Sequence, residues 1–236
     1  MNIPFFYAPD LNEAGSEYAL DETSVKHCVQ VLRKKEGDII MFSNGHGKLF
    51  QCIIEKASKK ECIVSIKNIK EVPSKTMKHG IGISFTKNIS RIEWFLEKAT
   101  EIGITDIYPM LTHRTERIKF NIGRLQNIII SAMLQSEQAW LPYLHEQISF
   151  EELVQKKDYK SKFIAHCENE EKQFLADKIN GKENMLVLIG PEGDFTPEEI
   201  SLSKEYQFIP VSLGPNRLRT ETAGLVACMM MNFQSS

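Results

Sequence analysis

Short apolar runs separated by turn residues characterise the first part of the chain. Three such runs lie at 39–42, 49–54 and 61–66, with Asn-Gly-His-Gly and Ser-Lys-Lys turn signals between them. Apolar residues at helical spacing between 22 and 33 predict one helix there. Closely spaced short strands of this kind are typical of a small β-barrel.

The rest of the chain alternates between strand-like and helix-like patterns. We expect strands at 81–85, 104–111, 162–167, 185–189 and 208–213, and helices at 90–102, 122–138, 196–205 and 219–233. Such alternation predicts a parallel sheet covered by helices on both faces. Residues 71–78 contain a proline and few apolar side chains, so they are the predicted linker. The expected domains are therefore 1–72 and 73–236, in an α/β protein with a β-barrel at its N-terminus.

Two of the predicted strands end in loops built around glycine and proline. The strand at 185–189 is followed by Gly-Pro-Glu-Gly, and the strand at 208–213 is followed by Gly-Pro-Asn-Arg-Leu-Arg-Thr-Glu. Ligands of open α/β sheets bind at the carboxyl ends of parallel strands, and glycine lets the backbone approach them. Alone, the first loop could be a tight turn into a helix capped by Thr196, Pro197 and Glu199. As a pair, the loops indicate a binding site.

Composition and known motifs narrow the chemistry. The chain has 42% hydrophobic and 25% charged residues, a net charge of −2 and no apolar run near membrane-spanning length. Five cysteines without CxxC spacing predict reduced and mostly buried thiols in a cytoplasmic protein. No complete dinucleotide, P-loop, zincin or nucleophile-elbow motif is found, and the histidines show no metal-ligand spacing. We expect no metal and no membrane association, and any nucleic acid must be bound through local basic clusters.

Several blocks of the sequence, in order, closely resemble one family. Residues 189–193 and 213–223 resemble the paired loop signatures of the RsmE family, which are 16S ribosomal RNA uridine-N3 methyltransferases of the SPOUT class. Residues 2–6, 27–33, 97–104 and 107–109 resemble the family's other motifs. The resemblance implies a PUA-like RNA-binding barrel, a C-terminal domain with a deep trefoil knot, and a homodimer with cofactor sites near its interface.

The resemblance also implies S-adenosylmethionine as the cofactor. Backbone groups of glycine-rich loops can contact an adenine edge, while apolar side chains enclose the ring. Residues His166, Cys167 and Glu168, which end the preceding strand, are candidates for a third wall. The expected cofactor-binding residues are Leu188, Ile189, Gly190, Glu192, Gly193, Leu213, Gly214, Leu218 and Thr220.

Methyl transfer to uracil N3 requires loss of a proton and stabilisation of charge on O2 and O4. A guanidinium beside these oxygens would stabilise that charge, and Arg219 is the first candidate, with Arg217 second. Glu221 or Glu192 could accept the proton, although the base could also be solvent. The alternative for Arg219 and Glu221 is a salt bridge that joins the loop to the helix.

Basic residues gather in several stretches that suit contact with folded RNA. Charge clusters are often only solvated surfaces, but an RNA substrate requires phosphate contacts. The partner implied is 16S ribosomal RNA or the small ribosomal subunit. The candidate RNA-binding residues are Arg33, Lys34, Lys87, Arg91, Arg114, Arg117 and Lys119.

The sequence departs from the family pattern at 134–140 and at 216–217. Leu134 stands where a Glu is usual, basic residues are missing up to Trp140, and the arginine of the second loop is shifted to Arg217. The last helix is apolar nearly all round, so we expect it to be buried in a core or an interface. Two alternatives stay open: a SPOUT enzyme with another RNA target, such as a ribose 2′-hydroxyl, and a non-catalytic RNA-binding assembly factor.

Overall fold

The computed structural model describes residues 3–116, 119–168 and 170–233. These residues divide into two compact units. The first contains the described residues up to Ser74 together with 133–141, and the second contains the remainder. The division after Ser74 lies two residues beyond the expected one. The return of 133–141 to the first unit was not foreseen, because nothing in that stretch distinguishes it from its neighbours along the chain.

A five-stranded sheet forms the first unit, in the order β1-β3-β4-β5-β2. β1 pairs with β3 in parallel, and the other pairs are antiparallel. The three predicted strands are confirmed as β3, β4 and β5. The two outer strands have three residues each, which is too short for a recognisable pattern. The strands are β1 (Phe5–Tyr7), β2 (Glu17–Ala19), β3 (Ile39–Ser43), β4 (Lys48–Ala57) and β5 (Cys62–Glu71).

The predicted helical segment near the N-terminus is confirmed and packs on this sheet. It begins as α1 (Glu22–Val25), continues as a π-helical stretch, η1 (Lys26–Val31), and ends two residues before the predicted end. Asp21 caps it by accepting a hydrogen bond from Ser24 N at 2.9 Å. Val25 and Cys28 join alternate residues of the strands in one apolar core. Alternation places every second strand residue in that core.

Trp140 has a structural role in the first unit. Its indole Nε1 donates to Val72 O at 2.9 Å. A Cβ at Gly47 would lie 2.3 Å from an indole carbon, so only glycine fits beneath this ring. Gly47 N also donates to Ala139 O, and Leu141 N donates to Gly45 O, both at 2.9 Å. Residues 139–141 are therefore packed within this unit.

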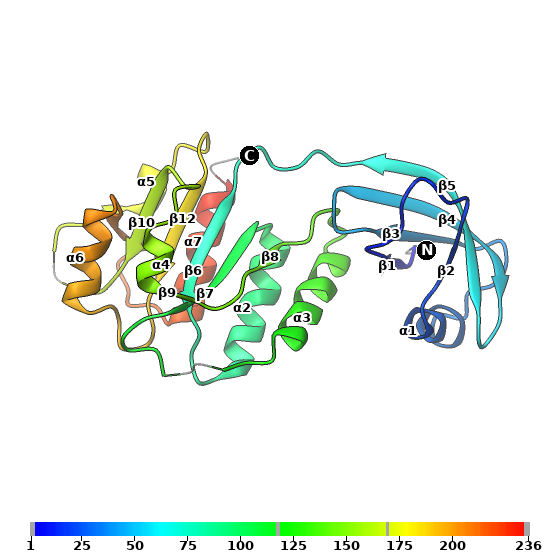
Figure 1. Ribbon diagram of the computed structural model, residues 1–236, viewed down its shortest axis with the longest axis horizontal. Coiled ribbons are helices and arrows are strands. Elements are labelled where there is room, and N and C mark those ends of the chain that lie inside the picture. The colour runs from blue at the N-terminus through cyan, green and yellow to red at the C-terminus, as the bar shows by residue number, and fades with distance from the viewer. Residues whose placement is uncertain (1–2, 117–118, 169, 234–236) are drawn as a thin grey trace. The chain divides into compact units, whose positions relative to one another are not determined.

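The second unit is built on a parallel sheet, in the order β11-β13-β10-β12-β6-β7-β8, with β9 also paired to β7 (Figure 1). All of its pairs are parallel, as predicted. All five residues of β12 are buried, as expected for a strand covered on both faces. The strands are β6 (His79–Ser84), β7 (Asp106–Leu111), β8 (Tyr143–Leu144), β9 (Ile148–Ser149), β10 (Ser161–Ala165), β11 (Gln173–Phe174), β12 (Met185–Ile189) and β13 (Ile209–Ser212).

Helices cover both faces of this sheet. α7 packs with α2 against β6 and β12, and a Cβ at Gly224 would lie 2.8 Å from atoms of Ile83 and Phe95. On the other face, Gly82 lies against Leu153 of α4 and Leu188 of β12. Alternation along β6 therefore separates the two layers. The helices are α2 (Ile89–Ile102), α3 (Ile122–Gln135), α4 (Phe150–Val154), α5 (Leu175–Lys178), α6 (Pro197–Glu205) and α7 (Thr220–Phe233).

The predicted start of α6 is confirmed. Thr196 accepts a hydrogen bond from Glu199 N, Glu199 accepts one from Thr196 N, and Pro197 occupies the first helical position. The short elements β8, β9, β11, α4 and α5 were not predicted, since two to five residues carry no clear period. The five cysteines are free, and Cys167 is the exposed one. No helix in the described part of the chain is both long and apolar enough to cross a membrane.

Candidate active site at the carboxyl ends of the parallel strands

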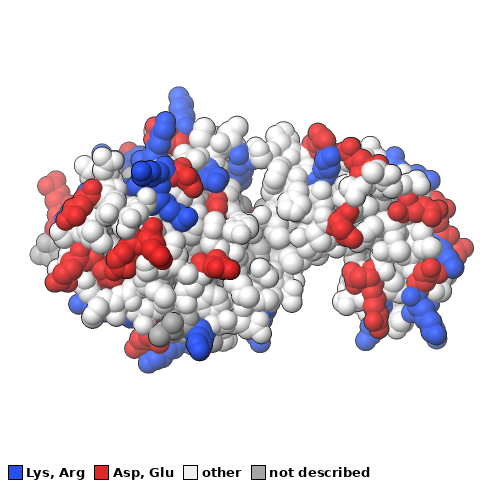
Figure 2. All heavy atoms as spheres, viewed as in Figure 1, with Lys and Arg blue, Asp and Glu red and all other residues white. Residues whose placement is uncertain are grey.

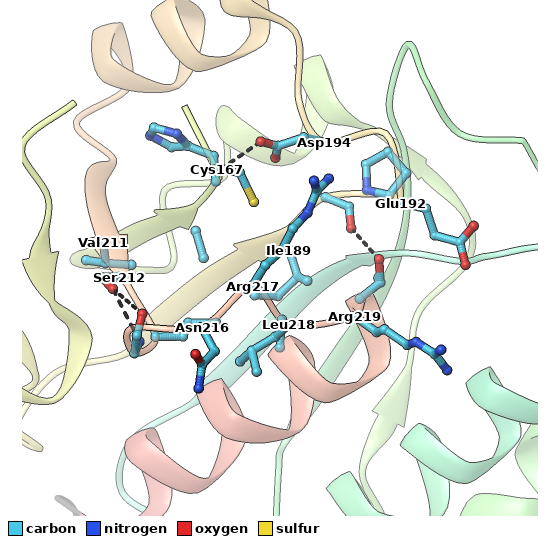
Figure 3. Close-up of a pocket in the computed structure, with 18 of the residues that line it drawn as sticks. Cys167, Ile189, Glu192, Asp194, Val211, Ser212, Asn216, Arg217, Leu218 and Arg219 are labelled. Carbon is cyan, nitrogen blue, oxygen red and sulfur yellow. Dashed lines mark hydrogen bonds between the residues drawn. The ribbon is translucent and has the colours of Figure 1, made fainter. Parts of the chain in front are cut away.

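A cavity of about 810 Å³ lies where β10, β12 and β13 end (Figure 3). Its walls are the residues that follow these three strands, the first turn of α7, and one side chain from α2. The lining residues are Arg91, Ala165, His166, Cys167, Lys172, Ile189, Gly190, Pro191, Glu192, Asp194, Val211, Ser212, Leu213, Gly214, Pro215, Asn216, Arg217, Leu218, Arg219, Thr220 and Ala223.

The first loop, which follows β12, is held in a specific backbone conformation. Asp194 has a φ of 63°, in the left-handed region that Asp tolerates better than most residues. Its carboxylate accepts hydrogen bonds from Cys167 N at 2.7 Å and from Phe195 N at 2.9 Å. A Cβ at Gly190 would lie 3.1 Å from the buried Phe195 ring, so glycine keeps the loop close to α6. Asp194 thereby ties the loop to the end of β10.

The second loop, which follows β13, turns tightly at Gly214. Gly214 has a φ of 141° and donates its N–H to Ser212 Oγ at 3.2 Å. Thr220, at the start of α7, donates its hydroxyl to Gly190 O at 3.1 Å and so connects the two loops. In Figure 3, Arg217 extends from the second loop toward the first, whereas Arg219 extends away from Arg217, on the side of the view where Glu192 lies. The two loops therefore form one cavity, and Arg217 extends across it from the second loop toward the first.

The cavity is more basic than the protein as a whole. Four cationic side chains line it (Arg91, Lys172, Arg217 and Arg219), against two carboxylates, while the chain carries a net charge of −2. Lys172 donates to the carbonyls of His166 and Glu168, both at 2.7 Å. On the face in Figure 2, acidic and basic side chains are interspersed over each unit. A local excess of cations favours a ligand with negative charge.

His166 presents a neutral imidazole to this site. Burial lowers the pKa of its ring, and the neighbouring Lys172 ammonium lowers that pKa further, against the opposing effects of Glu170 and Asp194. Its Nε2 lies 2.9 Å from Glu170 Oε1. The ring is therefore uncharged near neutral pH and adds no further cation to the cavity.

Arg91 is shared by two carboxylates from different segments. Its NH1 lies 3.1 Å from Glu192 Oε1 in the first loop, and its Nε lies 3.6 Å from Glu221 Oε1 in the first turn of α7. Glu221 is buried and does not line the cavity. Its Oε2 has no hydrogen-bond partner within the described residues. Among these residues Glu221 is paired with Arg91, and no Arg219–Glu221 ion pair is found.

The structure brings most of the predicted pocket residues together. Four predicted residues lie outside the lining: Leu188, which is fully buried against α4, Gly193, Glu221 and Glu168. Asp194 and Lys172 were missed. Asp194 stands two residues before the capping threonine, whereas no sequence signal marks Lys172. The predicted residues in the lining are His166, Cys167, Ile189, Gly190, Glu192, Leu213, Gly214, Arg217, Leu218, Arg219 and Thr220.

The predicted RNA-binding residues are not gathered in one place. Arg91 lines the cavity, and Arg114 donates to Gly193 O at 2.7 Å and to Phe195 O at 3.3 Å, so it supports the first loop. Lys87 forms an exposed ion pair with Glu116 at 2.9 Å, and Lys119 is exposed. On the first unit, Arg33 is exposed and Lys34 is half-buried. Arg117 lies outside the described residues.

The structure of this chain is similar to several known ones. A probable rRNA-methyltransferase from Porphyromonas gingivalis superposes with a TM-score of 0.91 at 35% identity, covering 99% of this chain and 98% of the other. A putative methyltransferase from Legionella pneumophila, in complex with SAM, gives 0.86 at 29% identity, covering 97% and 96%. A ribosomal RNA small subunit methyltransferase E from Neisseria gonorrhoeae, bound to S-adenosyl methionine, gives 0.85 at 28% identity, covering 96% and 95%.

Sequence comparisons agree with this similarity. The chain is 28% identical to the ribosomal RNA small subunit methyltransferase E of Rickettsia conorii, covering 90% of this chain and 87% of that protein. It is 27% identical to the protein of the same name from Bacillus subtilis, covering 94% and 92%. Residues 73–232 match the RNA methyltransferase domain model, and residues 20–67 match the RNA methyltransferase PUA domain model. The resemblance to the RsmE family is thus confirmed, and the chain belongs to the RNA methyltransferase family that joins these two domains.

Proposed function

We propose that this protein transfers a methyl group from S-adenosylmethionine to N3 of a uridine in 16S ribosomal RNA. The observation that carries the proposal is the cavity between the two glycine loops, which combines apolar walls with an excess of cationic side chains. Support comes from the family membership and from relatives that are named for small-subunit ribosomal RNA. Two similar structures carry S-adenosylmethionine.

The residues present fit such a cofactor. The cavity volume of about 810 Å³ is within the usual range of about 300–1,000 Å³ for small-molecule sites. Ile189, Leu213 and Leu218 offer apolar contact to an adenine ring, and the loop backbone offers donors and acceptors to its edge. Gly190 and Gly214 bring that backbone close. Asp194 and Lys172 provide opposite charges that suit a zwitterionic amino acid tail.

The reaction would break the N3–H bond of uracil and the S–CH3 bond of the cofactor and form an N3–CH3 bond; the proton would pass to a base, and S-adenosylhomocysteine would be the leaving group. The cofactor supplies the electrophilic methyl group. Arg217 or Arg219 would stabilise the negative charge that develops on uracil O2 and O4. Glu192 lines the cavity and is the better placed carboxylate for accepting the proton, because Glu221 is buried outside the lining. Precise positioning of the base against the methyl group supplies much of the remaining rate.

We assign RNA contact to the PUA-like first unit and to the basic residues of the second. Arg33 is exposed and Lys34 is half-buried on the first unit, and Lys87 and Lys119 are exposed on the second. Exposed cations of this kind bind phosphates and release counterions, so affinity should fall as salt rises. Ribosomal RNA as the substrate would place the protein in the cytoplasm.

A deep trefoil knot in the second unit is part of the same proposal. β13 lies beyond β10, on the side away from β12, yet α7 follows β13 directly and packs against β6 and β12. The chain therefore returns past β10 to reach the middle of the sheet. This path supports the knotted topology that the family resemblance implies.

A homodimer is supported by the two unequal faces of α7. One face is buried and includes Glu221, Gly224, Cys228 and Met231. The other face, Leu225, Val226, Met229 and Phe233, is apolar but only partly covered, and Met229 and Phe233 are 41% and 70% exposed. Apolar residues at this spacing favour a protein contact, and a second copy would cover them symmetrically. Sedimentation at several concentrations should give twice the mass of one chain.

The test of the activity is calorimetric titration with S-adenosylmethionine, followed by reaction with 16S ribosomal RNA and small subunits. We expect saturable binding and the appearance of N3-methyluridine in digested RNA. A 2′-O-methylated nucleoside instead would identify a SPOUT enzyme with another target. If the folded protein binds RNA but not the cofactor, the hypothesis of a non-catalytic assembly factor would be supported instead.

A further inference from the structure

The two carboxylate partners of Arg91 differ in their exposure to water. The side chain of Glu221 is 8% exposed, that of Arg91 is 31% exposed and that of Glu192 is 59% exposed. A largely exposed ion pair contributes little, whereas a buried carboxylate depends strongly on its cation. The contact with Glu192 is the shorter one, at 3.1 Å against 3.6 Å, but it is open to water and so can be replaced by another anion, whereas the buried Glu221 stays beside Arg91.

The place of Glu192 at Arg91 suits another anion. Arg91 and Glu192 both line the cavity, and the pair spans α2 and the first loop. Guanidinium groups bind carboxylate and phosphate oxygens with the same planar geometry. The other cationic side chains of the cavity also favour a negatively charged group there. Glu192 Oε1, 3.1 Å from NH1 of Arg91, thus occupies the position that an oxygen of a bound anion would take.

We propose that Arg91 binds an anionic oxygen group of a ligand, either a backbone phosphate of the RNA or the carboxylate of the cofactor. Glu192 is an internal competitor that fills this site until the ligand replaces it. The proposal rests on the proposed function for the identity of these two ligands. Displacement also frees the Glu192 carboxylate beside the cavity, so anion binding and the supply of a proton acceptor become coupled.

The competition makes a definite prediction for binding. Glu192→Gln removes the competing charge, and binding of the anionic ligand should tighten about two- to fivefold, the range expected for loss of an exposed ion pair. Arg91→Gln removes the site itself, and binding should weaken about tenfold or more. In the Arg91→Gln background, Glu192→Gln should have no effect. Binding is measured rather than turnover, because Glu192 is also a candidate base.

The experiment compares the four proteins of this double-mutant cycle with three ligands. S-adenosylmethionine is titrated by calorimetry, and a 16S RNA fragment is titrated by fluorescence anisotropy with saturating S-adenosylhomocysteine. Inorganic phosphate is the third ligand, and its binding does not depend on the methyltransferase assignment. If RNA affinity follows the predicted pattern across the four proteins, Arg91 binds a phosphate of the RNA. If S-adenosylmethionine affinity follows it, Arg91 binds the carboxylate of the cofactor.

Two controls keep the result interpretable. Glu205→Gln removes one negative charge at the exposed end of α6, outside the cavity, and should not change affinity. Arg91→Gln leaves Glu221 buried without its cation. The double variant Arg91→Gln, Glu221→Gln is therefore also measured, because it removes the Arg91 site without leaving a buried unpaired charge. Equal tightening in Glu205→Gln or in the Arg91→Gln background, or no tightening with any ligand, overturns the proposal. If phosphate affinity follows the predicted pattern across the four proteins but no RNA is methylated, only the proposed function is overturned.

Discussion

The two ends of the parallel sheet in the second unit differ in the polar side chains that lie there. At the carboxyl ends, Glu221 Oε2 and Thr86 Oγ1 are buried without a hydrogen-bond partner within the described residues. Cationic side chains, among them Arg217 and Arg219, line a cavity there. Unsatisfied buried polar atoms are rare in folded proteins, so they point to a place where a ligand or ordered water completes the structure.

At the amino end of β7, several polar side chains contact one another. Asp106, the first residue of β7, lies 2.9 Å from His145 Nε2 and accepts a hydrogen bond from Thr105 Oγ1 at 2.7 Å. The His145 ring stacks on Tyr108 at 3.8 Å, and the Tyr108 hydroxyl is 3.0 Å from that of Tyr159. We therefore expect changes at this end to affect stability, and changes at the carboxyl ends to affect binding.

The largest expected effect comes from Gly190→Trp at the binding end. An added Cβ would already lie 3.1 Å from the buried Phe195 ring, so the larger indole would displace that ring and with it the first loop. We expect S-adenosylmethionine binding to be lost, with the circular dichroism spectrum retained. Gly123→Trp is the matched control, because a Cβ there would meet only Asn121 Oδ1, at 3.5 Å. Undiminished binding in a folded Gly190→Trp protein would move the cofactor site elsewhere.

The next effect concerns the two arginines of the second loop. Arg217→Gln should lower kcat by about 100- to 1,000-fold, the usual result of removing a group that stabilises developing charge. Arg219→Gln should have a smaller effect, because Arg217 extends toward the first loop and Arg219 extends away from it (Figure 3). Single-turnover rates with saturating cofactor measure both. The reverse order would make Arg219 the group beside the uracil oxygens.

At the opposite end, Asp106→Asn should reduce the free energy of unfolding by about 1–3 kcal/mol, because buried partners lose a charged acceptor. Cofactor affinity should not change. Urea unfolding and calorimetry measure the two quantities, and Asp158→Asn, at an exposed position, is the control. A loss of cofactor affinity in Asp106→Asn would show that the two ends of the sheet are coupled, so that changes at the amino ends affect binding as well as stability.

The smallest expected effect is the pH dependence of the stability that Asp106 contributes. Burial alone would raise the pKa of Asp106, but hydrogen bonds from His145 and Thr105 outweigh it and lower the pKa below its ordinary value. A lowered folded-state pKa means that the stabilisation is complete above about pH 4 and is lost as pH falls through the folded pKa. Urea midpoints should therefore decline less steeply below pH 4 in Asp106→Asn than in the natural protein. Identical slopes would remove Asp106 from the acid response.

Much of the fold follows from local pattern. The buried run 185–189 is β12 to the residue, and the Thr196–Glu199 capping box begins α6 as expected. Elements of two to five residues, such as β8, β9 and α4, escape prediction because a period of 2 or 3.6 needs more residues to be visible. The return of Trp140 to the first unit also escapes, since its partner Val72 is 68 residues away in the chain.

The two glycine loops, the strands that lead into them and the family of the chain can all be inferred from the order of amino acids. Which charged side chains meet at these loops depends on the folded arrangement. It placed Arg91, from a helix about 100 residues before Glu192, between two carboxylates, removed Glu221 from the lining, and brought Lys172 and Asp194 into it. Backbone preference and hydrophobic period act over a few residues, whereas ion pairs are formed by whatever the folded sheet brings within a few ångströms.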